Sequence, residues 1–153
     1  MYLFGFCSEL ALMNFDRAIQ ELRDIRGLGA RSSERVVELW VKYISAKRRS
    51  LDYEEWAVLE QVLIAALDSG EDEVAYNCLE CLKAQFPESA RVNRLCGMYL
   101  EYKGLFDDAR SIYAKLLEDD ITNTLARKRL ISIFKAQSRI PDAIEELRKY
   151  LKM

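Results

Sequence analysis

The sequence has no histidine and only two prolines and six glycines among its 153 residues. The lack of histidine excludes Ser/His/Asp and Cys/His nucleophile systems, the HExxH zinc-protease site and every His-ligated metal centre. Its 23 Lys and Arg nearly balance its 25 Asp and Glu, so the net charge of −2 gives no bulk attraction to nucleic acid or anionic membranes. There is also no glycine-rich phosphate loop. We therefore predict a protein that is not an enzyme.

Cysteine is scarce as well. The four cysteines, at positions 7, 78, 81 and 96, are too few and too irregularly spaced for a disulfide framework. Cys78 and Cys81 have CxxC spacing, but no second CxxC completes a four-ligand zinc site. We interpret all four as reduced thiols of a cytosolic protein and predict no metal and no cofactor.

Long apolar runs are missing. Beyond the N-terminus the longest is 62–67, six residues, whereas a helix needs roughly 20 to span a bilayer. The apolar start at 1–7 lacks the basic segment and cleavage site of a signal peptide. We expect membrane association only through partners, and the role of residues 1–13 stays open.

Apolar residues recur at helical spacing, and alternating strand patterns are absent. Glycine and proline divide the chain into about eight helices of roughly 12 to 15 residues. Gly27 and Gly29 separate the first helix from the second, and Pro87 follows a helix that ends near Phe86. Pro141 lies where a first-turn proline is tolerated.

A repeat of 34 residues runs through the second half of the chain. An alanine recurs at this period, at Ala75, Ala109 and Ala143. Five residues before each alanine stands another small residue: Gly70, Gly104 and Ser138. The alanines allow two antiparallel helices to approach closely, and the glycines suit a turn that needs left-handed backbone.

This period, with its small and aromatic positions, resembles the tetratricopeptide repeat (TPR). The middle unit matches best, through Gly97, Gly104, Phe106, Ala109 and Tyr113. The resemblance implies an all-α TPR superhelix with an irregular N-terminal helical cap over residues 1–50. Three repeats, at approximately 56–87, 90–121 and 124–153, would pack as one domain over 51–153.

Several stretches resemble one TPR family in particular, subunit 2 of the endoplasmic reticulum (ER) membrane protein complex. They include EQVLIAALDSG (60–70), QFPES (85–89), DDA (107–109), TNT (122–124), ARKR (126–129) and KAQ (135–137). The resemblance covers roughly residues 15–153. It implies a non-catalytic cytoplasmic scaffold, peripheral on the cytosolic face of the ER membrane, in a complex that supports insertion of transmembrane proteins. Its partners would be the cytosolic parts of ER membrane subunits.

Two surfaces are candidate binding sites. The first helix of each TPR lines a concave groove, which here would carry Arg91, Arg94, Met98, Glu101, Lys128 and Lys135. Its basic residues can bind an acidic peptide through charge-assisted hydrogen bonds, and a merely solvated charged face is the alternative. The last helix presents an open C-terminal face: Ile144, Leu147, Tyr150 and Leu151. Because members of the family continue into further repeats, we expect that this chain is a shorter form or that another protein covers this face.

Two other functions compete with this interpretation. A generic TPR adaptor for chaperones or another assembly is one, although Leu95 and Met98 stand where chaperone-binding repeats use asparagine. An RNA-binding helical repeat is the other, suggested by the basic clusters 47–49 and 127–129. These clusters are shorter than the basic runs of about five to eight residues typical of such patches, and no aromatics are interleaved with them. We expect no nucleic-acid partner.

Overall fold

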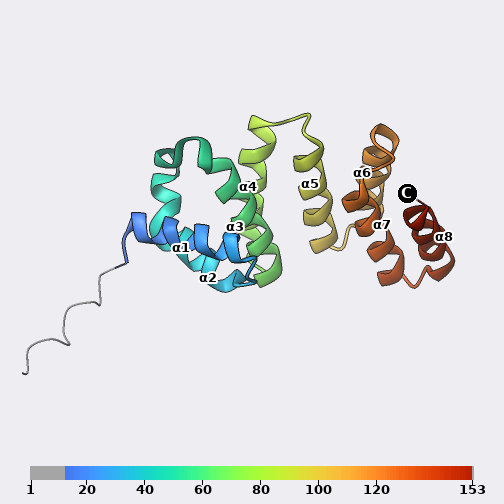
Figure 1. Ribbon diagram of the computed structural model, residues 1–153, viewed down its shortest axis with the longest axis horizontal. Helices are drawn as coiled ribbons and strands as arrows, with labels where there is room; N and C mark the ends of the chain where they lie inside the picture. The colour runs from blue at the N-terminus through green and yellow to red at the C-terminus, as the bar shows by residue number, and fades with distance from the viewer. Residues whose placement is uncertain (1–12, 153) are drawn as a thin grey trace, which may run out of the picture. The chain divides into compact units, whose positions relative to one another are not determined.

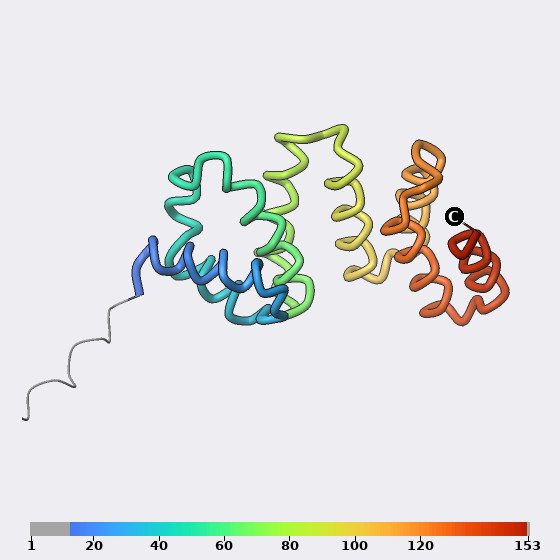
Figure 2. Tube along the Cα trace, in the orientation of Figure 1, coloured from blue at the N-terminus to red at the C-terminus, as the bar shows by residue number. Residues whose placement is uncertain are grey.

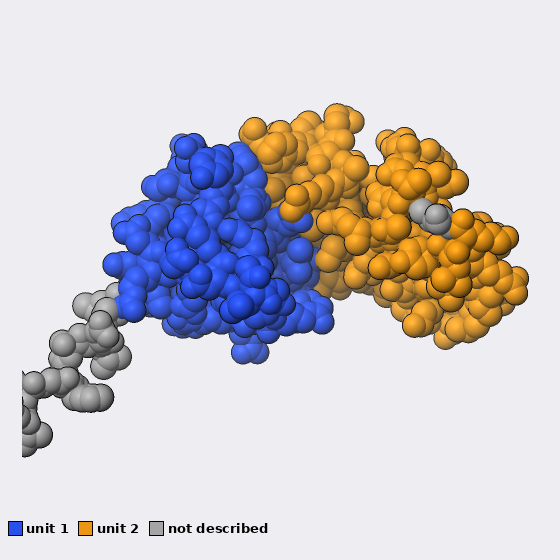
Figure 3. Space-filling view, in the orientation of Figure 1, with its two compact units in different colours: residues 1–74 blue, residues 75–153 orange. Residues whose placement is uncertain are grey.

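The computed structural model describes residues 13–152, and every regular element within them is a helix (Figure 1). The elements are α1 (Phe15–Leu28), α2 (Ser33–Leu39), η1 (Trp40–Ile44), η2 (Ser45–Glu54), α3 (Glu55–Ser69), α4 (Asp72–Gln85), α5 (Ala90–Tyr102), α6 (Phe106–Asp119), α7 (Thr124–Ala136) and α8 (Ile140–Leu151). The predicted all-α class is confirmed. Cys7 and the apolar start at 1–7 lie outside the described residues. The chain divides into two compact units, 1–74 and 75–153 (Figure 3).

In the first unit, α1 has a capping residue at each end. The Asn14 side chain accepts a hydrogen bond from the backbone N–H of Arg17 at 3.0 Å, which satisfies one of the donors left unpaired at a helix start. The helix continues through Gly27 and ends before Gly29, which adopts a left-handed φ of 61°. Only the second of the two glycines predicted to break this helix therefore does so.

Between α2 and α3 the backbone winds irregularly (Figure 2). The segment η1 is a π-helix and η2 a 3₁₀-helix that contains non-helical residues at Lys47 and Asp52. Asp52 has a φ of 53°, which is costly for a residue with a Cβ atom and persists only where neighbouring contacts hold it. Buried Leu51 precedes it, and Glu54 follows in a dense polar cluster.

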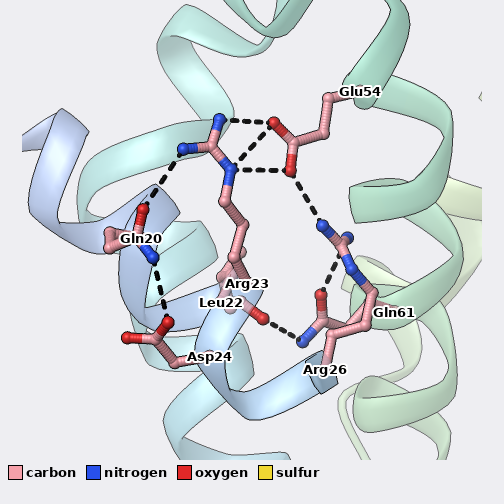
Figure 4. Close-up of polar contacts among 7 residues, drawn as sticks. All are labelled: Gln20, Leu22, Arg23, Asp24, Arg26, Glu54 and Gln61. Carbon is pink, nitrogen blue, oxygen red and sulfur yellow. Dashed lines mark hydrogen bonds and ion pairs between the residues drawn. The ribbon is translucent and has the colours of Figure 1, made fainter.

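Glu54 ties this irregular segment to α1 (Figure 4). Its Oε2 atom lies 2.6 Å from Nη2 of Arg23, and its Oε1 atom lies 2.8 Å from Nη2 of Arg26. The hydrogen bond from Arg23 holds the pKa of the Glu54 carboxyl below its usual range. From α3, the Gln61 side chain donates to the backbone carbonyl of Leu22 at 3.0 Å. These bonds fix α1 to the chain that follows Asp52.

In the second unit, α5 packs against α6, α6 against α7, and α7 against α8. The 34-residue spacing that predicted a repeat corresponds to recurring burial and recurring backbone conformation. The three alanines are buried: Ala75, Ala109 and Ala143. The three turn positions all adopt left-handed φ, at 82°, 76° and 57°: Gly70, Gly104 and Ser138. The three turn residues therefore share one backbone conformation, even where serine replaces glycine.

A close contact between Gly97 on α5 and Tyr113 on α6 lies in the core of this unit. The Tyr113 ring is completely buried among apolar residues that include Leu116 and Leu130. A Cβ atom at position 97 would lie 2.5 Å from Cζ of Tyr113, closer than real side chains pack. Glycine is thus required here for close approach of a large ring.

We predict that Gly97→Ala destabilises the protein by about 1–3 kcal/mol, because the added methyl group overpacks the core against Tyr113. Urea unfolding followed by circular dichroism measures the loss. Gly27→Ala is the matched control, since its added methyl group meets nothing within 4 Å and sits in a helix. It should be neutral or stabilise by about 0.5–1 kcal/mol. Equal effects of the two substitutions would contradict this account of the core.

Candidate functional site

The six predicted groove residues lie on two helices. Helix α5 carries four of them and α7 the other two: Arg91, Arg94, Met98, Glu101, Lys128 and Lys135. Spacings of three and four residues within α5, and of seven within α7, place side chains on one face of each helix. Arg91, Lys128 and Lys135 are exposed, whereas Arg94, Met98 and Glu101 are half-buried. Leu95, at a position where chaperone-binding repeats use asparagine, is buried.

The Glu101 carboxylate is hydrogen-bonded to other side chains of the protein. Its Oε1 atom accepts from the Tyr113 hydroxyl at 2.7 Å and from Nε of Arg129 at 2.9 Å. Its Oε2 atom accepts from Nη2 of Arg129 at 2.8 Å. One carboxylate therefore joins α5, α6 and α7. Sequence analysis missed Arg129 as its partner, because residues 28 apart on separate helices leave no periodic signal.

This network shifts the ionisation of Tyr113. Burial raises the pKa of the phenol far above its usual range, and the hydrogen bond to the Glu101 carboxylate raises it further. The neutral hydroxyl donates to the carboxylate, whereas a phenolate beside it would be both desolvated and repelled. Tyr113 therefore keeps its proton throughout the physiological range.

The basic cluster 127–129 is largely neutralised inside the fold. Arg127 is only 4% exposed; its Nη1 atom lies 2.7 Å from Oε2 of Glu146, and its Nη2 atom donates to the Ile121 carbonyl at 3.2 Å. Arg129 is paired with Glu101. Lys128 alone of the three is exposed, with its ammonium 5.5 Å from the ring centroid of Tyr150. The cluster that suggested RNA binding thus presents a single exposed cation.

The other basic cluster, 47–49, lies in the first unit. Arg48 is half-buried and its Nε atom lies 3.4 Å from Oε1 of Glu55. Lys47 and Arg49 are exposed. Here again the central arginine is paired within the fold.

The predicted C-terminal face is an apolar surface on α8. Ile144, Leu147 and Leu151 are exposed, and Tyr150 is half-buried. Ile140, which the sequence analysis did not include, is also exposed one turn before Ile144. The buried residue of α8 is Ala143, the third alanine of the 34-residue spacing.

None of the three cysteines that the structure describes is fully exposed. Cys78 is buried, and Cys81 and Cys96 are half-buried. Burial raises the pKa of the Cys96 thiol, which keeps it protonated and poorly nucleophilic at neutral pH. Within residues 13–152 no group of three or more Cys, Asp or Glu side chains is placed to hold a metal ion.

Comparison with known proteins links this architecture to one family. Residues 79–153 match the sequence model described as the EMC2 TPR-like repeat domain. ER membrane protein complex subunit 2-A of Xenopus laevis is 45% identical over 141 residues, which cover 90% of this chain and 48% of the relative. The resemblance to the subunit 2 family is confirmed. The repeat fold is accordingly of the TPR-like class.

More distant relatives include a subunit 2 protein and a protein named for its TPR repeats. ER membrane protein complex subunit 2 of Dictyostelium discoideum is 31% identical over 134 residues, covering 86% of this chain and 42% of the relative. The TPR repeat protein oca3 of Schizosaccharomyces pombe is 37% identical over 98 residues, covering 64% of this chain and 35% of the relative. The chain spans about half the length, or less, of the curated relatives it matches.

The raised pKa of Tyr113 predicts a loss of stability in alkali. The unfolded tyrosine releases its proton near pH 10, while the folded one retains it, so the folded state binds more protons and its stability falls as pH rises above about 10. We expect the free energy of unfolding of the parent, relative to Tyr113→Phe, to decrease by up to about 1.4 kcal/mol per pH unit there. Urea titrations of both proteins from neutral to alkaline pH test this. A constant difference would show that Tyr113 titrates normally.

The buried ion pair between α7 and α8 predicts a contrast between two adjacent glutamates. Glu146→Ala leaves the buried Arg127 guanidinium without its carboxylate and should destabilise the protein by about 3 kcal/mol. Glu145→Ala removes only an exposed pair with Lys149 and should cost less than about 0.5 kcal/mol. Chemical denaturation of both variants compares them. Similar losses would contradict the buried pair.

Proposed function

We propose that this chain is a non-catalytic scaffold that binds cytosolic segments of other subunits of the ER membrane protein complex. Its partners then hold it on the cytosolic face of the ER membrane, where the complex supports insertion of transmembrane proteins. The support is the similarity to subunit 2 proteins together with a TPR-like helical surface. In this proposal, residues 51–153 work as three stacked repeats after an N-terminal helical cap.

The single observation that carries the binding mode is the ion pair between Glu101 and Arg129. It joins the first helices of two successive helix pairs, α5 and α7. Arg94, Met98 and Glu101 share a face of α5 through spacings of three and four residues, and Lys128 and Lys135 share a face of α7 through a spacing of seven. In this proposal the two faces border one surface. The Glu101–Arg129 pair holds the two helices together, and Arg91, Lys128 and Lys135 stay exposed.

The chemistry of this surface suits an acidic segment with apolar anchors. Lys128 and Lys135 present exposed ammonium groups, and Arg91 adds an exposed guanidinium. Half-buried Met98, seven residues after Arg91 on α5, offers an adaptable apolar contact. A peptide with carboxylates at its rim and one or two apolar side chains at its centre would form charge-assisted hydrogen bonds around a desolvated core.

Within residues 13–152 no helix combines the length and the apolar character needed to cross a bilayer. In the proposed function, membrane association is therefore supplied by the bound subunits. Purification of the tagged protein from mildly detergent-solubilised membranes, followed by mass spectrometry, tests this. Near-stoichiometric recovery of multi-pass ER proteins would support the assignment. Recovery of soluble chaperones alone would favour the generic adaptor instead.

We predict that reversing two groove charges lowers that recovery. Lys128→Glu with Lys135→Glu removes two charge-assisted contacts and should reduce recovered ER subunits by at least about tenfold. Lys47→Glu with Lys115→Glu is the matched control, since both lysines are exposed and lie outside the proposed groove. Quantitative mass spectrometry of both pull-downs measures the ratio. Equal recovery with the two double variants would exclude the groove as the binding site.

A further inference from the structure

The basic cluster of the first unit leads directly into an exposed serine. Lys47, Arg48 and Arg49 precede Ser50, and the apolar Leu51 follows it. Lys47, Arg49 and Ser50 are exposed, and Arg48 is half-buried. Cations two and three residues before a serine, with an apolar residue directly after it, suit a protein kinase with an acidic substrate groove, because kinases select their substrates partly by charge pattern.

The backbone around Ser50 is irregular, which makes the serine easier to present to an enzyme. A kinase binds the residues around its acceptor serine in an extended form, so a serine within a regular helix must first be released from the hydrogen bonds of that helix. Ser50 lies in η2 between two non-helical residues, Lys47 and Asp52, and Asp52 has the strained φ of 53°. Leu51 is the buried side chain of η2. Opening of this segment therefore exposes little apolar surface and releases backbone strain.

The contact between this cluster and α3 is a long one. The Nε atom of Arg48 lies 3.4 Å from Oε1 of Glu55, whereas Arg23 and Glu54 approach to 2.6 Å. Charge-assisted hydrogen bonds are strongest at the shorter separation. Arg48 can therefore exchange Glu55 for the carboxylates of a kinase groove more readily than Arg23 could leave Glu54.

We propose that Ser50 is a phosphorylation site for a protein kinase that selects basic residues before the acceptor. The γ-phosphoryl group of ATP passes to Oγ of Ser50, the hydroxyl proton passes to the catalytic base of the kinase, and ADP leaves. The phosphate adds a charge of about −1.5 to −2 next to three cations and so largely cancels their positive charge. The groove takes no part in this modification, so the inference stands independently of the proposed function.

Ser132 on α7 provides an internal comparison. It also follows basic residues, with Arg129 three positions and Lys128 four positions before it. Its hydroxyl donates to the Lys128 carbonyl at 3.0 Å within a regular helix, and Arg129 is bound by Glu101. Cations thus precede both serines, but the backbone is irregular at Ser50 and helical at Ser132. We expect the kinase to distinguish them on this ground.

Incubation of the purified chain with ATP and the catalytic subunit of cyclic-AMP-dependent protein kinase, followed by peptide mass spectrometry, tests the proposal. We expect close to one phosphate per chain on Ser50, and modification of Ser132 that is at least about tenfold slower. Ser50→Ala should remove this phosphate, whereas the matched control Ser132→Ala should be modified like the parent. Circular dichroism at the reaction temperature confirms that the parent and both variants are folded. Modification of Ser132 as fast as Ser50 overturns the proposal.

A synthetic peptide of residues 45–57 separates the charge pattern from the fold. Glu55→Gln removes the carboxylate that holds Arg48, so it should speed phosphorylation of the folded chain about two- to fivefold. The same substitution should leave the rate of the peptide unchanged, because the peptide has no folded pair to break. A peptide that is modified while the folded chain is not overturns the proposal, since the fold then shields Ser50. Failure of both chain and peptide overturns it equally.

Discussion

The Glu101 carboxylate is the interaction on which the second unit depends. It accepts hydrogen bonds from Tyr113 and Arg129, and so holds α5, α6 and α7 through one side chain. Without it, a buried hydroxyl and a half-buried guanidinium would lack their partner, a cost that exceeds the net gain of an ordinary hydrogen bond. The Tyr113 ring reaches this carboxylate only because Gly97 leaves room for it. Packing and polar contacts at this point are therefore inseparable.

The same principle recurs at the next helix junction and in the first unit. Arg127 and Glu146 join α7 to α8, and Glu54 joins the irregular segment before α3 to the two arginines of α1. In each case a charged residue, which the sequence alone would place at the surface, forms an ion pair between elements that are distant along the chain. These pairs remove charge from the exterior. The cations that stay exposed include Arg91, Lys128 and Lys135 of the proposed groove.

The chemistry of the proposed groove indicates the kind of partner that it would suit. It combines exposed ammonium groups with one adaptable apolar side chain, a pattern suited to an extended acidic segment.

The sequence by itself determined the helices and the turns between them. The 34-residue spacing located three buried alanines and three left-handed turn residues, Gly70, Gly104 and Ser138, because side-chain volume and backbone preference belong to the residue itself. It could not predict the irregular winding at Asp52, where no glycine or proline marks the positive φ. Nor could it separate Lys128 from its two arginine neighbours. Only the tertiary structure decided which charges face solvent, because their partners lie 19 and 28 residues away on other helices, where packing alone brings them together.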